Sequence, residues 1–150
     1  MDETTQAWIR QVVAGLAEQT DEATCQRVLE SCGRRCFPPA LGAKVRALWQ
    51  EATTVRGFLD ELHAAFDPVQ IVDGAIHVVY PQCYCEQIDG IPPLDVPSAY
   101  CNCSVGWVRE LFKQATGRDV PVEALTTIVR GGPECRFRVD LGIALDAPLP

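Results

Sequence analysis

The sequence predicts an α+β fold, in which N-terminal helices pack on a mostly antiparallel sheet together with one long amphipathic helix. Residues 1–66 repeat apolar side chains at helical spacing, whereas residues 69–81 and 120–145 alternate apolar and polar side chains as strands do. One long helical pattern, residues 104–117, lies between these two β-rich stretches. This order of elements is typical of the α+β class.

Length and composition fit one domain over residues 1–150. The chain is 47% hydrophobic and 22% charged, so it holds enough apolar material to bury a core. We divide the domain into a helical N-terminal part, residues 1–66, and a second part, residues 67–150. The second part carries a hairpin, a cysteine-rich loop, a helix and the C-terminal strands.

Charge and the N-terminal residues exclude several partners. A net charge of −7 and a pI near 4.7 argue against nucleic acid, because phosphate binding needs clustered Lys and Arg. The start, "MDETTQAWIRQ", lacks the basic and apolar regions of a secretory signal, and no stretch is long enough to span a bilayer. We therefore expect a cytoplasmic protein without a membrane partner. In that compartment the eight cysteines are metal ligands, redox groups or buried thiols more often than structural disulfides.

Apolar residues recur at helical spacing in four segments of the N-terminal part. Thr20 is expected to cap the second helix and Gly33 to end it, while Thr53 or Thr54 starts the fourth. The expected apolar faces are Trp8, Ile9, Val12, Val13 and Leu16; Cys25, Val28, Leu29 and Cys32; Leu41, Val45, Leu48 and Trp49; and Val55, Phe58, Leu59, Leu62 and Phe66.

A hairpin and an irregular loop follow. Asp73-Gly74 separates two β-rich runs, and both residues tolerate the positive φ that a two-residue hairpin turn requires. Residues 82–98 are rich in proline, so we expect an irregular loop with rigid stretches, which crosses the mouth of a pocket.

The long helix and the last strands complete the predicted fold. Ser104 is a suitable N-cap and Gly117 a suitable C′ residue, while the second C-terminal strand begins at Cys135 after a Gly-Gly-Pro turn. Alternation directs Cys135 inward and Arg136 outward. The expected buried sets are Val108, Leu111, Phe112 and Ala115 on the helix, and Cys135, Phe137, Val139 and Leu141 on the strand.

Two Cys-x-Cys pairs, "CYC" at 83–85 and "CNC" at 101–103, are the motifs that carry chemistry. In extended chain, residues i and i+2 face the same side, so Cys101 and Cys103 are expected to point together at one object. The helix N-terminus that follows favours thiolates, which bind metal or attack electrophiles. With Cys135, the pairs supply more than the four thiolates of a closed tetrahedral zinc site.

We favour metal ligation, while redox or disulfide chemistry and buried thiols remain as alternatives. Zinc is preferred to an iron–sulfur cluster, because the spacing matches no ferredoxin run. The segment Cys32-Gly-Arg-Arg-Cys36 is a second choice, since Cys32 also fits the apolar face of its helix. The candidate ligands are Cys83, Cys85, Cys101, Cys103 and Cys135, followed by Cys32 and Cys36.

Three aromatic residues are candidates for contacts with a bound molecule. Tyr84 and Tyr100 adjoin the thiols, and Trp107 lies on the helix that follows. His63 and His77 are interpreted as structural residues on a helix and a strand. The sequence contains no serine triad order, phosphate loop or dinucleotide motif, so no catalytic residue is assigned.

The second part of the chain resembles the 4-vinyl reductase domain family over roughly residues 70–145. The resemblance rests on a Cys and a Gly before an amphipathic helix, a Gly that ends it, a strand, and "GGPECRFRV". It implies a small-molecule-binding α+β domain with structural zinc, in which Cys101 or Cys103 is the first ligand and Cys135 the last. Thr127 stands where the sensor branch commonly has a Cys, and only Glu123 lies near the expected acidic ligand.

The cysteine pairs and "CGRRC" also resemble a cysteine-rich bacterial branch near this family and near aminothiazoline-carboxylate hydrolases. Two function classes follow. In the first, a zinc-binding domain binds or senses a small apolar or aromatic molecule. In the second, the protein is a metal- or thiol-dependent hydrolase of a small thiazoline- or amide-like substrate, with Glu86 or Asp89 to handle the proton, or a thiol redox protein. The N-terminal helices could also support a homodimer.

Overall fold

The computed structural model describes residues 1–150 and confirms the α+β class. The α-helices are α1 (Glu3–Gln19), α2 (Glu22–Arg35), α3 (Pro39–Glu51), α4 (Val55–Ala65) and α5 (Asn102–Thr116). The strands are β1 (Val69–Val72), β2 (Ala75–Tyr80), β3 (Val122–Thr126) and β4 (Cys135–Val139). Short 3₁₀ turns are η1 (Glu86–Ile88), η2 (Pro93–Asp95), η3 (Ser98–Cys101) and η4 (Ile128–Arg130).

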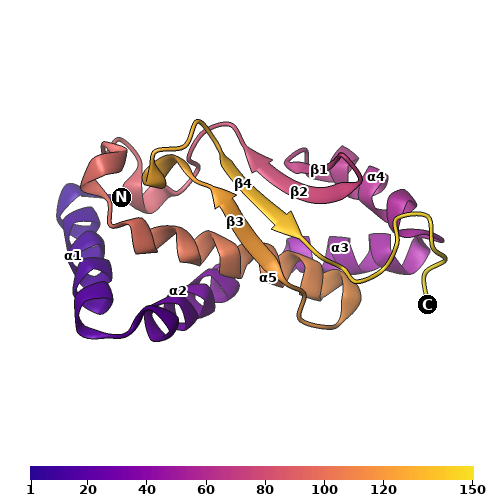
Figure 1. Ribbon diagram of the computed structural model, residues 1–150, viewed down its shortest axis with the longest axis horizontal. Helices are drawn as coiled ribbons and strands as arrows, with labels where there is room; N and C mark the ends of the chain where they lie inside the picture. Colours follow the sequence, from indigo (N-terminus) through magenta and orange to yellow (C-terminus); the bar gives the residue numbers. More distant parts are fainter.

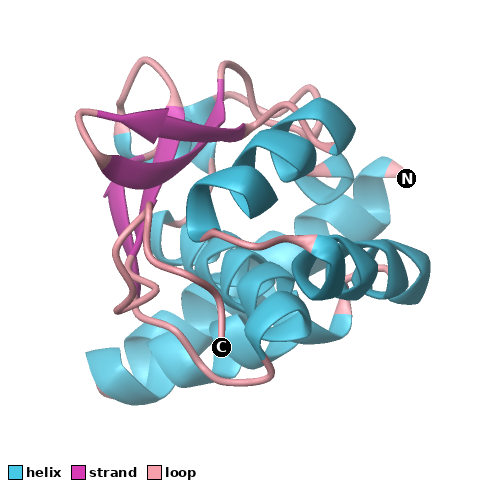
Figure 2. Ribbon diagram, turned by 90° about the vertical axis from the view of Figure 1, so that its right-hand side faces the viewer, coloured by secondary structure: helices cyan, strands magenta, loops and turns pink.

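The four strands form one sheet in the order β1-β2-β4-β3, and every pairing is antiparallel. The strands gather on one side of the molecule and the helices on the other (Figure 2). Helix α5 runs along the middle of the long axis, with α1 and α2 towards one end and α3 and α4 towards the other (Figure 1). None of the helices combines the length and the apolar composition that a membrane crossing requires.

The predicted hairpin is confirmed. Asp73 and Gly74 join β1 to β2 with φ values of 50° and 77°, the positive values that a primed two-residue turn needs. The loop over residues 82–98 is irregular, as expected, and three short 3₁₀ turns stiffen it and the residues that follow it. The loop therefore leads from the edge of β2 to the start of α5 without regular structure of its own.

Two apolar clusters make up the core. The larger lies between the sheet and helices α3, α4 and α5, and it contains the whole predicted stripe of α5 and all four predicted inward residues of and after β4. The smaller lies between α1, α2, the cysteine-rich loop and η4, with Val13, Leu29 and Tyr100 among its members. Periodicity thus predicted the buried faces of α5 and β4 correctly.

The helix ends in the N-terminal part differ in detail from the expectation. Asp21 caps α2 instead of Thr20, because its carboxylate accepts the backbone N–H of Thr24 at 2.9 Å. Thr54 caps α4, as expected. On α1 the expected apolar face is only partly buried, since Trp8 and Val12 are 63% and 46% exposed.

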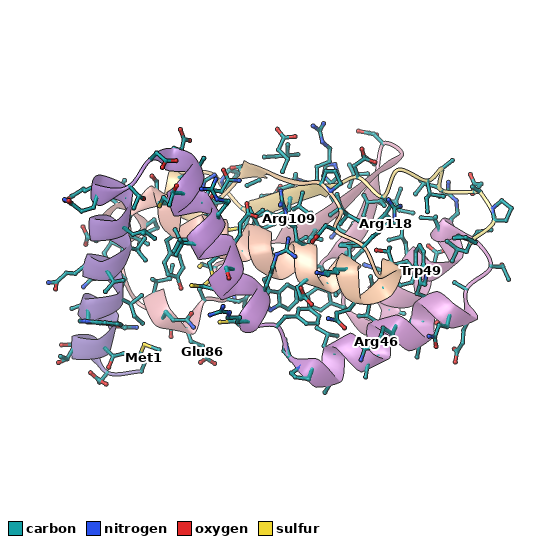
Figure 3. The ribbon with its side chains drawn as sticks, turned by 90° about the horizontal axis from the view of Figure 1, so that it is seen from below. Met1, Arg46, Trp49, Glu86, Arg109 and Arg118 are labelled. Atoms are coloured by element: carbon teal, nitrogen blue, oxygen red, sulfur yellow. The ribbon has the colours of Figure 1, made fainter.

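Gly33 does not end α2, contrary to the prediction, because it lies inside the helix where α2 meets α5. A Cβ atom at Gly33 would lie 1.8 Å from the carbonyl oxygen of Cys103, and one at Gly106 would lie 2.0 Å from that of Glu30. The two backbones can touch only because both positions lack a side chain. Beside this contact, Arg109 Nη1 pairs with the buried Glu30 Oε2 at 3.1 Å. Arg109 is labelled on α5 in Figure 3.

We predict that Gly33→Ala lowers the free energy of unfolding by about 3 kcal/mol, because the added methyl group would overlap a backbone carbonyl that cannot move aside. Gly15→Ala is the matched control, since no atom lies within 4 Å of its Cβ position in α1. The free energy of unfolding of Gly15→Ala should rise by about 0.5–1 kcal/mol, because Ala favours the helix more than Gly does. Urea unfolding measures both. Equal urea midpoints for Gly33→Ala and Gly15→Ala would contradict the close contact between the backbones of α2 and α5.

Candidate functional site

Seven of the eight cysteines come together around the first turn of α5, with Cys101 in the smaller core and Cys135 in the larger. They derive from four segments that are distant in the sequence, and their charges act on one another. The segments are the end of α2 with Cys32 and Cys36, the loop after β2 with Cys83 and Cys85, the start of α5 with Cys101 and Cys103, and the start of β4 with Cys135. Cys25 packs in the smaller core beside Leu29.

Cys101 and Cys103 do not lie in extended chain, so the expectation that they point together is wrong. The turn η3 runs directly into α5, and the N-cap is Cys101 with φ −64° and ψ −11°, whereas Ser104 lies inside the helix. At about 100° per residue, two positions apart in a helix differ by about 200° in direction. The two thiols therefore leave the helix on opposite sides.

The inner thiol group consists of Cys83, Cys85, Cys101 and Cys135. Cys101 is 5% exposed in the smaller core, and Cys83 and Cys85 pack against that core. The charges of Cys135 and Cys83 act on Cys101, and that of Cys83 acts on Cys135. These four thiols thus come from three segments and lie in both cores, since Cys135 belongs to the larger core and Cys101 to the smaller.

Residues 127 and 128 supply hydrogen bonds to the inner thiol group. The backbone N–H of Ile128 donates to Cys135 Sγ at 3.4 Å, and the fully buried Thr127 hydrogen-bonds the thiol of Cys101. Burial raises the pKa of both thiols, and these hydrogen bonds oppose the rise. Thr127 therefore adjoins the thiols at the position where the sensor branch of the 4-vinyl reductase family commonly has a cysteine.

Cys83 and Cys85 behave as a coupled pair. A hydrogen bond between the two thiols lowers the pKa of Cys83 to about 6, against the effect of burial. The same contact, together with burial and the charges of Cys83, Cys103 and Cys101, raises the pKa of Cys85. One thiolate of the pair is thus stable near neutral pH, while its partner stays protonated.

The outer thiol trio consists of Cys32, Cys36 and Cys103. Cys32 and Cys36 are exposed at the end of α2, whereas Cys103 is partly buried against that end. Burial raises the pKa of Cys103 to about 11, and the charges of Cys36 and Cys32 add to the rise.

The donor set suits a soft metal, because seven neighbouring thiols are the ligands that zinc and similar ions prefer. However, no three or more His, Cys, Asp or Glu residues converge as ligands of one ion. Ligation would need new χ1 rotamers at some of the thiols.

The three predicted aromatic residues lie near the thiols in different settings. Tyr84 is 60% exposed and packs edge-on against Tyr80, with 6.0 Å between ring centroids. Tyr100 is buried and donates its hydroxyl to Gln87 Oε1 at 3.1 Å. Trp107 packs in the core, 4.9 Å from the Phe37 ring.

The other polar candidates are engaged elsewhere. His63 Nδ1 donates to the carbonyl of Val69 at 2.7 Å, and His77 Nδ1 accepts from Arg136. Burial and then the Arg136 charge lower the pKa of His77. Glu123 pairs with Arg138 on the outer face of the sheet and does not face the thiols.

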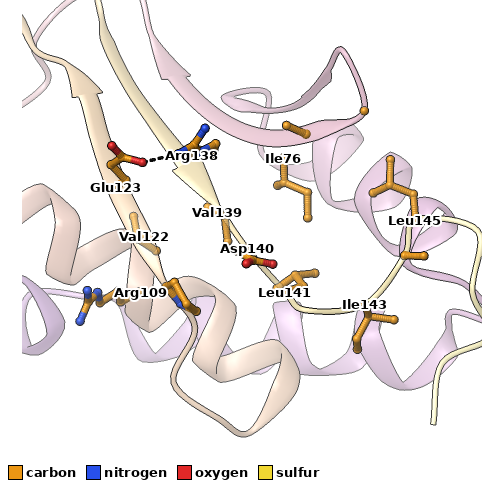
Figure 4. A pocket seen from close by; sticks show the side chains of 14 residues that line it. Ile76, Arg109, Val122, Glu123, Arg138, Val139, Asp140, Leu141, Ile143 and Leu145 are labelled. Carbon is orange, nitrogen blue, oxygen red and sulfur yellow. Dashed lines mark hydrogen bonds and ion pairs between the residues drawn. The ribbon is translucent and has the colours of Figure 1, made fainter.

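Two of the hollows in the surface have volumes of more than 500 Å³, and neither is lined by any of these aromatic residues. One, of about 510 Å³, lies between the end of the sheet and the C-terminal segment, and the Glu123–Arg138 pair stands at its rim (Figure 4). The other, of about 550 Å³, is reached by the loop only at Ser98. The lining of the first by Ile143 and Leu145 was missed, because these residues follow the last strand without periodic structure.

The chain matches, over residues 1–144, the model of a family described as "Family of unknown function (DUF6144)". The chain belongs to this family. No curated protein matches it. Among solved structures, the DUF6144 chain is similar to the phenol-responsive sensory domain of the transcription activator PoxR with phenol, at 16% identity and a TM-score of 0.44, covering 90% of this chain and 73% of that chain. A similarity at that TM-score carries no conclusion here, and the resemblance to the 4-vinyl reductase family stays a prediction.

We predict that Cys83 of the metal-free, reduced protein is alkylated by iodoacetamide at a rate that falls as pH drops through about 6, where its thiolate takes up a proton. Cys85→Ala removes the thiol that hydrogen-bonds Cys83, so the midpoint should move to higher pH. Tandem mass spectrometry of the labelled peptide measures the rate at each pH. A midpoint that Cys85→Ala leaves in place would refute the coupling.

Proposed function

We propose that this DUF6144 protein is a metal-binding domain that holds a soft cation, zinc in the first instance, through its cysteines and binds a small apolar or aromatic molecule. The observation that supports metal binding is the gathering of seven thiols from four segments of the chain. Incidental cysteines, spread over the sequence, would have no reason to gather in one region. The inner thiol group supplies the four ligands in this proposal.

The charge balance of the inner thiol group supports a cation. The hydrogen bond with Cys83, then burial and the charges of the neighbouring thiols raise the pKa of Cys85, so the group cannot ionise completely on its own. A divalent cation reverses this balance, because it favours the thiolate at every ligand. The hydrogen bonds to Cys101 and Cys135 favour the same charge state. A zinc ion bound there would tie the loop, α5 and β4 together.

The hollow of about 510 Å³ at the end of the sheet supports the small-molecule part of the proposal. Its volume lies within the usual range for ligand pockets, and apolar side chains such as Ile76 and Leu141 line it beside Arg138 and Asp140. The opening and the mixed lining suit a small molecule with an apolar body and a polar group. The thiols do not line this hollow, so in this proposal the metal supports the fold and does not contact the ligand.

We predict that the protein, purified without chelator, retains about one zinc per chain. Cys101→Ser and Cys135→Ser should each lower that content, since each removes a ligand. Cys25→Ser is the control and should leave the zinc content intact, because Cys25 packs with apolar residues in the smaller core. Plasma emission spectroscopy of dialysed protein gives the metal content, and circular dichroism checks the fold. Absence of any transition metal, or equal contents in all variants, would overturn the proposal.

A second function, a metal- or thiol-dependent hydrolase, is favoured by one observation. Cys83 is half-buried and its pKa is lowered to about 6, as a nucleophile or an exchangeable ligand requires. Glu86 and Asp89 are exposed in the same loop, and Asp89 is close enough for its charge to act on Cys83, so in this alternative one of them handles the proton.

Sulfur counting by X-ray absorption at the metal edge separates the two functions. We predict four sulfur ligands and loss of the folded state when a chelator removes the metal, because a closed site contributes folding energy. Two or three sulfur ligands with an oxygen, in a protein that stays folded without metal, would instead establish the open site that a hydrolase needs.

A further inference from the structure

Strand β3 forms one edge of the sheet and has no neighbouring strand on its outer side. The strand order is β1-β2-β4-β3, so only β4 pairs with it, and β3 is the strand that lies towards α1 and α2 in Figure 1. An unpaired edge presents backbone N–H and C=O groups to any extended chain that approaches it. A further strand can therefore be added beside β3.

The hydrogen-bond pattern shows which backbone groups of β3 are free. The N–H of Asp140 donates to the carbonyl of Pro121 at 3.0 Å, which makes the next residue, Val122, part of a non-hydrogen-bonded pair with β4. Alternate residues of an antiparallel strand direct their backbone groups to opposite sides. Glu123 therefore faces β4, whereas the N–H and C=O groups of Val122 and Ala124 face outward and have no partner in the chain.

These free groups belong to the wall of the hollow of about 550 Å³, which we call the α2–β3 hollow. Val122 and Ala124 line it on the side of the strand, and Glu22, Cys25 and Gln26 line it on the side of α2. Residues of η3 and of the first turns of α5 complete the lining. Addition of an extended peptide to a free sheet edge is a common mode of protein recognition, and here the edge opens into a hollow with room for one.

The surroundings of the edge favour a single extended segment over a second copy of this chain. Pairing of β3 with the same strand of a second copy would bring a whole domain against the edge, and α2 stands opposite that edge. Pro121, which has no N–H, and the irregular pairing after Ala124 bound the free stretch. The five residues of β3 span about 17 Å, so a short peptide can reach along the whole strand.

One charge in the α2–β3 hollow has no countercharge. Arg130 donates through Nε to the carbonyl of Ser98 and through Nη2 to Asn102 Oδ1, each at 3.1 Å, and neither of these acceptors is charged. Glu123 is already paired across the sheet, and Glu22 lies in the first turn of α2, where the helix favours its negative charge. An acidic side chain on the bound segment would therefore form a charge-assisted hydrogen bond with Arg130.

We propose that the α2–β3 hollow binds an extended peptide segment of a partner protein, which adds a strand to the sheet beside β3 and places an acidic side chain next to Arg130. The backbone of the segment hydrogen-bonds Val122 and Ala124, and its inward side chains contact Cys25 and Val105. This inference needs neither a bound metal nor the hollow at the end of the sheet. Its outcome is therefore independent of the proposed function.

A library of random seven-residue peptides displayed on phage, selected against the reduced wild-type protein, supplies the probe. We expect selected peptides to share an acidic residue at a fixed position, and one of them is synthesised with a fluorescent label for anisotropy measurements. Methylation of its backbone nitrogens, one at a time, should weaken binding about tenfold at alternate residues only. This period of two is expected because only alternate N–H groups of an added strand face β3.

Ala124→Pro tests the edge of the strand directly, because proline removes an N–H that β4 does not use. This variant should bind the selected peptide about tenfold more weakly. Ala124→Ser keeps the N–H and is the matched control that should bind normally. Arg130→Gln should weaken the selected peptide but not a version of it in which Gln replaces the acidic residue. Circular dichroism checks the fold of each variant, and the methylation pattern decides alone if a variant unfolds.

Every other outcome overturns the proposal. A selection that yields no binding peptide, methylation effects without a period of two, or equal binding to Ala124→Pro and Ala124→Ser would each do so. A wild-type dimer in light scattering, dissociated both by Ala124→Pro and by the selected peptide, would also overturn it, because a second copy of the chain would then occupy the edge.

Discussion

The close crossing of α2 and α5 is the contact on which the rest of the structure depends. Gly33 and Gly106 let the two backbones touch without side chains between them, and the Glu30–Arg109 pair lies beside this contact. Because α5 also packs under the sheet, the crossing fixes the end of α2 relative to β4 and to the cysteine-rich loop. Four segments that are distant in the sequence are thereby held around one helix turn. The proposed site in the inner thiol group depends on this arrangement.

Two opposing electrostatic effects meet at that turn. Burial and like-charged neighbours keep the thiols of Cys85, Cys101 and Cys103 protonated, whereas hydrogen-bond donors and the start of α5 favour thiolates. Within the inner thiol group, the metal-free state with Cys83 as its one thiolate and the metal-bound state with every ligand ionised are therefore both stable. Intermediate states, with several thiolates and no cation, are costly. Such a region should take up and release metal together with several protons.

The features that could be predicted from the sequence are those that depend on the local spacing of apolar and polar residues. The fold class, the Asp73-Gly74 hairpin, the buried stripe of α5 and the inward face of β4 follow from local patterns, which reflect which side chains leave water. Gly33 was misread because a glycine that ends a helix and one that admits a neighbouring backbone look alike in a single sequence. The prediction that Cys101 and Cys103 point the same way was wrong because the turn η3 continues directly into α5. No residue pattern in the sequence indicates this turn. The gathering of the thiols depends on the crossing of α2 and α5, so it could not be predicted.

The attachment of α1 has a consequence for the cysteine-rich loop. Gln6 Nε2 donates to the backbone carbonyls of Glu86 and Asp89, at 3.4 and 3.1 Å, and Val13 packs into the smaller core. The outward residues Trp8 and Val12 leave the opposite side of the helix uncovered. The docking of α1 and the ordering of the loop are thus coupled, and such a coupling acts equally in both directions. Whatever orders the loop strengthens the docking of α1, and any molecule that draws α1 away loosens the loop by the same free energy.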